Sequence, residues 1–139
     1  MLVHSNGDDI NIIEQQQVFV TLAKLKQQGL IRCFGMSTKT IAGGLLTLEY
    51  ADVVMATYNL ANTSEQPILD KAKQLNKSIL IKKALASGHV HTLSNHDPIQ
   101  NCFKLIYQQP AVTSIIIGTI NPQHLTQNIN YAYQAISHT

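Results

Sequence analysis

The sequence has few charged residues, few aromatic residues and no tryptophan, and these shortages exclude several classes of protein. Only 13% of the 139 residues are charged and 45% are apolar, which is typical of a folded globular domain. Arg32 is the only arginine and the lysines are scattered, so we expect no nucleic-acid partner. No apolar run is long enough to span a membrane and no signal peptide opens the chain, so we expect a cytoplasmic protein without a membrane partner.

Cysteine is also scarce. Cys33 and Cys102 lie in apolar runs without the spacing of a metal or redox motif, so we expect two buried free thiols in a reducing compartment. The length favours a single domain, residues 1–139.

Histidines gather in the polar stretch SGHVHTLSNHD. His89, His91 and His96, with Asp97 beside them, could in principle hold a metal ion. Because no cysteine and no other carboxylate stands at ligand spacing, a solvated loop is the preferred interpretation, and we expect no metal site.

What the sequence does have is a regular alternation of short β-branched runs with helical patterns. The expected strands are residues 2–4, 31–36, 52–57, 78–81 and 113–117, and the expected helices are 13–28, 40–49, 66–75, 97–108 and 122–136. This order predicts an α/β fold of parallel strands with right-handed crossovers, about five (β/α) units. An open doubly wound sheet and part of a (β/α)8 barrel both fit, but the glycine-rich nucleotide motifs of open sheets are missing.

Polar or small residues follow every expected strand. In either architecture these strand ends meet at one edge, where binding sites form. They are His4-Ser5-Asn6, Ser37-Thr38, Thr57-Tyr58-Asn59, Lys82-Lys83 and Gly118-Thr119. Each alone could simply be an exposed loop, so the pattern suggests a site without specifying one.

Five segments resemble, in order, the second half of an aldo/keto reductase: LVHSNGDD, GLIRCFGMST, EYADVVMATYNL, ILIKKALASGH and PAVTSIIIGTINPQHLTQNI. The resemblance covers essentially the whole chain, from the fourth strand of the family's barrel to its last helix. That fold is a (β/α)8 barrel that binds NADPH and reduces aldehydes and ketones to alcohols. The resemblance thus implies the C-terminal half of a TIM-type barrel carrying most of a cofactor site.

The turn at 117–122 is where the resemblance places the adenosine phosphates of NADP. A helix N-terminus attracts anions, and Gly118 lets the backbone approach a ligand. Residues assigned to this end of the cofactor are Gly118, Thr119, Asn121, His124, Gln127 and Asn128, with His124 near the 2′-phosphate and Asn128 on the adenine. An ordinary Asn-Pro helix start is the alternative.

The resemblance assigns the nicotinamide end to other strand ends. His4 matches the catalytic residue that orients the substrate carbonyl. The remaining cofactor positions are Ser37, Thr38, Met55, Lys82, Leu85, Ser87 and Gly88. Met55 replaces a glutamine and Lys82 replaces a stacking aromatic residue, so the orientation of the nicotinamide is in question.

The family's catalytic tyrosine, aspartate and lysine lie on strands one to three, which have no counterpart in this sequence. We therefore expect no reductase activity from the chain alone, and weak NADP binding or none. A half-barrel would expose an apolar inner face, expected from the runs 53–56 and 115–117, so we expect a homodimer. The alternatives are a non-catalytic assembly module and, less favoured, a Schiff-base lyase using Lys82 or Lys83.

Overall fold

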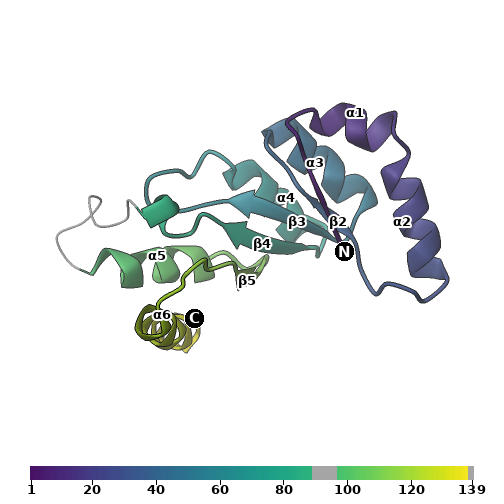
Figure 1. The fold of residues 1–139 in the computed structure, drawn as a ribbon. Coiled ribbons are helices and arrows are strands. Elements are labelled where there is room, and N and C mark those ends of the chain that lie inside the picture. Colours follow the sequence, from purple (N-terminus) through teal and green to yellow (C-terminus); the bar gives the residue numbers. More distant parts are fainter. Residues whose placement is uncertain (89–96, 138–139) are drawn as a thin grey trace.

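The computed structural model describes residues 1–88 and 97–137. Its centre is a sheet of five parallel strands in sequential order: β1 (Leu2–His4), β2 (Gly35–Ser37), β3 (Val53–Thr57), β4 (Ser78–Lys82) and β5 (Val112–Ile115). The helices are α1 (Asp9–Glu14), α2 (Val18–Gln27), α3 (Ile41–Tyr50), α4 (Gln66–Gln74), α5 (Pro98–Tyr107) and α6 (Pro122–Ile136). This arrangement confirms the expected fold class (Figure 1).

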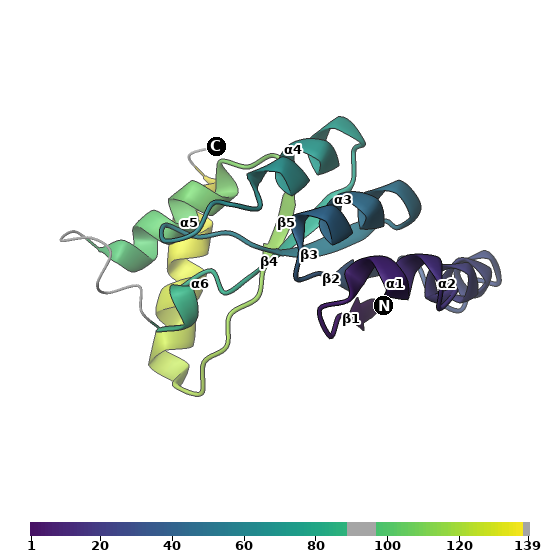
Figure 2. The same ribbon diagram turned by 90° about the horizontal axis from the view of Figure 1, so that it is seen from above.

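The helices cover one face of the sheet. In Figure 2, α3 and α4 lie side by side along the strands. Strand β4 shows the result, because Ile79 and Ile81 are fully buried under the helices while Leu80 and Lys82 are half-buried. The register places Met55 beside Leu80 and Val53 beside Ser78, so these side chains share the other face. That inner face is open, as expected of part of a barrel.

The core lies between the covered face and the helices. One cluster joins Val54, Ile79 and Ile81 to helices α3, α4 and α5, and the other joins Met36 to α1 and α2. Ile115 and Ile117 pack against the first cluster. The expectation that the runs 53–56 and 115–117 belong to the inner face is therefore wrong for Val54, Ala56, Ile115 and Ile117, since these side chains point toward the helices.

Two further expectations need correction. The pattern at 13–28 predicts one helix, but α1 and α2 are separate, with Gln17 in a left-handed conformation between them (φ 52°). Cys102 is buried as expected, whereas Cys33 is exposed. Cys33 precedes β2 rather than lying within it, because that strand begins two residues later, at Gly35.

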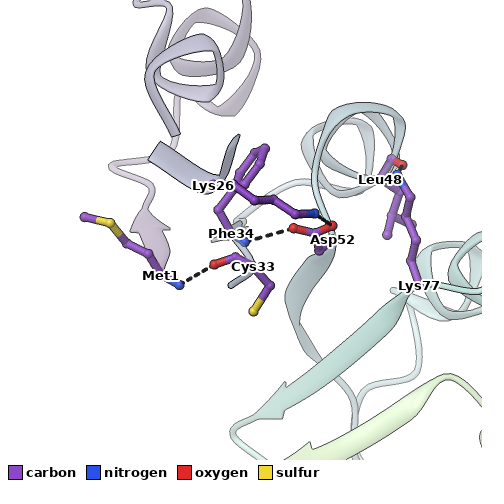
Figure 3. A network of polar contacts seen from close by, with 7 residues as sticks. All are labelled: Met1, Lys26, Cys33, Phe34, Leu48, Asp52 and Lys77. Atoms are coloured by element: carbon purple, nitrogen blue, oxygen red, sulfur yellow. Dashed lines mark hydrogen bonds and ion pairs between the residues drawn. The ribbon is translucent and has the colours of Figure 1, made fainter. Parts of the chain in front are cut away.

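The amino ends of the strands are fastened by Asp52 (Figure 3). Its carboxylate accepts a hydrogen bond from the Phe34 N–H at 3.0 Å and pairs with the Lys26 ammonium at 2.5 Å. Burial tends to raise the pKa of Asp52, but the bonds from Lys26 and Phe34 outweigh it and hold that pKa below its ordinary value. Asp52 thus ties helix α2 and strand β2 to the start of β3.

Asp9 does the same at the carboxyl ends of β1 and β2. One of its oxygens accepts hydrogen bonds from the Thr40 N–H at 2.8 Å and the Thr40 hydroxyl at 2.7 Å, and both oxygens face the Lys39 N–H. Gly43 permits this approach, because a Cβ there would lie 2.2 Å from that of Asp9. The glycine that weakens helix α3 by propensity is thus required by packing.

We predict that Asp9→Asn destabilises the protein by about 1–3 kcal/mol, because an amide cannot accept all these bonds and its NH₂ would face the N–H and O–H donors of Lys39 and Thr40. Burial raises the pKa of Asp9, but bonds from Ser5, Thr40 and Lys39 lower it below the ordinary value. The carboxylate therefore stabilises the fold above the unfolded-state pKa, and this contribution disappears as pH falls through the lower folded-state pKa.

Urea unfolding of the wild type and of Asp9→Asn between pH 3 and pH 7 measures both effects, with Asp8→Asn, at the exposed neighbour, as the control. A variant as stable as the control at pH 7 would contradict the role given to Asp9.

Candidate functional site

A cavity of about 650 Å³ opens at the carboxyl end of the sheet. The ends of β1, β2, β3 and β4 and the loops that follow them supply its walls. Its lining comprises His4, Thr38, Lys39, Thr57, Asn59, Ala61, Asn62, Glu65, Lys82, Lys83 and Ala86. We call this the lysine cavity. Of the predicted site residues, it brings together His4, Thr38 and Lys82.

Lys82 reaches across the inner face of the sheet. Its ammonium donates hydrogen bonds to the Ser37 hydroxyl at 3.1 Å and to the Thr38 carbonyl at 2.5 Å. Strand β3 lies between β4, which carries Lys82, and β2, which carries Ser37, so the lysine stem crosses over β3. The side chain therefore holds two strand ends together and contacts both residues predicted to grip the nicotinamide amide.

The surroundings of Lys82 disfavour its charged form. Burial lowers the pKa of its ammonium below the ordinary value. Glu65 opposes that effect, the nearby charge of Lys83 adds to it, and weaker contributions come from Asp9 and Lys39 in opposite directions. Two other ammonium groups thus act on the same cavity.

Two residues to which the sequence assigned no specific role shape this cavity. Asn59 is buried, accepts the Asn62 N–H at 2.9 Å and donates to the Lys83 carbonyl at 2.8 Å. Glu65 accepts the Thr57 N–H at 2.9 Å. Asn59 was visible as part of a polar strand end, but Glu65 precedes a helix and nothing in the sequence links it to β3.

A second cavity, of about 560 Å³, lies between β5, α5 and α6. Its lining comprises Leu85, Gly88, Asp97, Pro98, Ile99, Ile117, Gly118, Thr119, His124, Gln127, Asn128 and Tyr131. We call this the helix cavity. Seven residues predicted from the resemblance meet here: Leu85, Gly88, Gly118, Thr119, His124, Gln127 and Asn128.

Other predicted residues lie beside the cavities or play local structural roles. Asn121 caps α6, since its side chain accepts the Gln123 N–H at 2.9 Å, and the Thr119 hydroxyl accepts the Asn121 N–H at 3.2 Å. Met55 is half-buried on the inner face and lines neither cavity. Ser87 belongs to the short 3₁₀ turn Ala86–Gly88. His89, His91 and His96 lie outside the described residues.

An acidic residue also faces the helix cavity. Asp97 caps α5 by accepting the Gln100 N–H at 3.0 Å, and it accepts a hydrogen bond from the Tyr131 hydroxyl of α6. Residues 114–128 contain no acidic side chain, and the sequence alone does not show that the start of α5, with Asp97, packs against α6. Within the described ranges, no group of three potential metal ligands occurs and no helix is long and apolar enough to cross a membrane.

The two cavities differ in how well they fit a nicotinamide cofactor. In the lysine cavity, the buried Thr38 hydroxyl has no hydrogen-bond partner among the described residues, as a position awaiting a polar ligand would. In the helix cavity, a Cβ at Gly118 would meet open space, and the lining contains both apolar and polar side chains. For a 2′-phosphate, however, His124 is the one side chain among the described lining residues that can carry positive charge, and the carboxylate of Asp97 opposes it.

Known structures place this arrangement in a family. Over 97% of its length, the chain is 47% identical to a protein of Pseudomonas aeruginosa assigned to the aldo-keto reductases, with a TM-score of 0.87. The chain belongs to the aldo/keto reductase family. It spans 51% of that relative's length, consistent with the expected C-terminal half of the barrel.

More distant aldo/keto reductase structures agree in fold alone. An aldo-keto reductase of Bacillus halodurans superimposes with a TM-score of 0.79 at 13% identity, covering 99% of this chain and 59% of its own. The glycerol dehydrogenase of Gluconobacter oxydans superimposes with a TM-score of 0.61 at 16% identity. The match covers 97% of this chain and 58% of the dehydrogenase. No protein-family model and no curated protein matches the chain.

We predict opposite shifts in the pKa of Tyr131 when its two partners are removed. The hydrogen bond to Asp97 is the main reason that this pKa lies above its ordinary value, whereas the bond from Gln127 lowers it. Asp97→Asn should therefore lower the pKa of Tyr131 and Gln127→Ala should raise it further. NMR titration of the tyrosine Cζ signals measures both, and shifts in the same direction would contradict this geometry.

Proposed function

We propose that the chain supplies the cofactor-binding half of an NADP-dependent aldo/keto reductase and is inactive by itself. The main supporting observation is that the lysine cavity and the helix cavity flank a single segment, residues 82–88, which contributes to both linings. An extended dinucleotide has two ends to place, and this arrangement suits such a molecule. Leu85, Ser87 and Gly88 would then lie along its pyrophosphate.

In this proposal each cavity takes one end of the cofactor. The Ser37 hydroxyl and the Thr38 carbonyl would hold the nicotinamide amide, with Lys82 giving up one of its present contacts to them. Gly118, Gln127 and Asn128 would hold the adenosine. Bound NADPH supplies the hydride for carbonyl reduction.

His4 would orient the carbonyl oxygen of an aldehyde or ketone, since it is exposed to the lysine cavity at the end of β1. Reduction also needs a proton donor at that oxygen. The lining of the lysine cavity, within the described residues, includes no tyrosine. The family's donor comes from the half of the barrel that this chain does not span, so the chain lacks the group that completes the reaction.

We predict weak binding of 2′,5′-ADP to the chain, tighter than the binding of 5′-AMP. Calorimetry should show His124→Ala reducing this preference by up to about fivefold, as expected for an exposed charge contact. Asp97→Asn should increase the affinity for 2′,5′-ADP by removing a repelling carboxylate, and Gln74→Ala on α4 serves as the control. Equal affinity for both nucleotides would remove the role of His124.

The same preparation, given NADPH and 4-nitrobenzaldehyde, should oxidise NADPH no faster than a heat-treated sample. Turnover that persists in His4→Ala would mean that another residue supplies the proton, and the inactive-half proposal would fail.

The open inner face favours a second candidate, an assembly module. A cavity of about 470 Å³ on this face is lined by Leu2, Val53, Ser78 and Leu80 among others. Leaving apolar surface in water costs about 25 cal/mol per Å², so a few hundred Å² would cost several kcal/mol. This is comparable with the whole stability of a small domain. A second copy of the chain could cover the face in a two-fold dimer.

We predict a homodimer at micromolar concentration by sedimentation equilibrium. Leu80→Lys should dissociate the dimer, because the ammonium would enter the covered face. Val20→Lys, at an exposed position of α2, should not. A compact wild-type monomer that melts cooperatively and binds no dye specific for exposed apolar surface would contradict the dimer.

A further inference from the structure

The lysine cavity has an excess of positive charge that a neutral nicotinamide amide does not explain. Lys39, Lys82 and Lys83 line it together with His4, and Glu65 supplies the one carboxylate among the described lining residues. That carboxylate is already engaged, since it accepts the Thr57 N–H at 2.9 Å. Asp9 lies nearby but is used by Thr40 and Lys39, as described above.

Lys82 is the most enclosed of these cations. It is half-buried, whereas Lys39 and Lys83 are exposed. An ammonium carries three N–H groups, and the structure describes two acceptors for it, the Ser37 hydroxyl and the Thr38 carbonyl. Both acceptors are neutral, so no opposite charge compensates Lys82 at hydrogen-bond distance among the described residues.

Two independent observations indicate that a ligand belongs beside it. The pKa of Lys82 is lowered, first by burial and then by the neighbouring Lys83, so its charge is unfavourable in the cavity as it stands. Thr38 lines the same cavity, and its buried hydroxyl has no hydrogen-bond partner among the described residues. A group that accepts hydrogen bonds and carries negative charge would satisfy both residues at once.

We propose that the lysine cavity binds an oxoanion, the carboxylate or phosphate group of a small molecule, with Lys82 as the central contact. Lys39 and Lys83 add attraction from the rim, and the Thr38 hydroxyl donates to the same group. The charge of the anion relieves the repulsion among the lysines.

The oxoanion site is inferred from this chain's own residues, but its assignment to a substrate rests on the proposed function. If that function holds, His4 and the oxoanion site share one cavity, and the substrate is an aldehyde or ketone that carries a carboxylate or phosphate. The other source of the same chemistry is the pyrophosphate of the cofactor, since residues 82–88 adjoin the cavity.

Amide NMR of the chain tests the proposal with three probes: succinic semialdehyde, its neutral analogue butanal, and inorganic pyrophosphate. We expect an anionic probe to shift the signals of Thr38, Lys82 and Lys83, with affinity at least tenfold lower in Lys82→Gln. Lys73→Gln, on the far end of α4, should bind like the wild type. Binding of the semialdehyde assigns the site to substrate, and binding of pyrophosphate alone assigns it to the cofactor.

Lys39→Gln provides a second variant. Lys39 is exposed, so this substitution should leave the fold intact and lower the affinity for the anionic probe severalfold. Unchanged affinity in both Lys82→Gln and Lys39→Gln would overturn the proposal, as would butanal binding as tightly as the semialdehyde. Binding of 2′,5′-ADP reports on the helix cavity instead. If 2′,5′-ADP does not bind but the anionic probes do, the cofactor proposal is rejected and the oxoanion site still stands.

Discussion

Helices cover one face of the parallel sheet and leave the other face bare, and most other features of the molecule depend on that asymmetry. Residues on the covered face, such as Val54 and Ile79, are fully buried. Those opposite them, such as Leu80 and Lys82, are only half-buried. Parallel strands are normally buried on both sides. The inner face therefore needs more polypeptide, from another copy or from the remainder of a barrel, and the lysine cavity lies at the edge of this unfinished surface.

Much of the fold followed from patterns that depend on neighbouring residues. Helix α6 was predicted to its ends because Asn121 and Pro122 form a strong start signal and the apolar period continues to Ile136. The strands were found because β-branched runs separate helical patterns. Helix α1 was missed since only six residues form it, which is too short for a period to show.

The candidate site divides in the same way. The order of strand ends predicted that His4, Thr38 and Lys82 meet, because carboxyl ends of parallel strands share one edge. It could not predict that Asp97 lines the same cavity as His124, because that arrangement depends on how α5 packs on α6. Nor could it explain the glycines of α3, where Gly44 leaves room for Ile68, whose Cδ1 would lie 2.3 Å from an added Cβ. Contacts between elements distant in sequence leave no local pattern.

The segment that separates the two cavities has unusual backbone geometry. Lys83 and Ala86 adopt left-handed conformations, with φ of 55° and 49°, although neither is glycine. Each such residue costs about 1 kcal/mol or more and persists only where its surroundings enforce it. The bond from Asn59 to the Lys83 carbonyl is one such constraint. The enforced conformation has a consequence for both cavities, since Lys83 and Ala86 line the lysine cavity while Leu85 and Gly88 line the helix cavity.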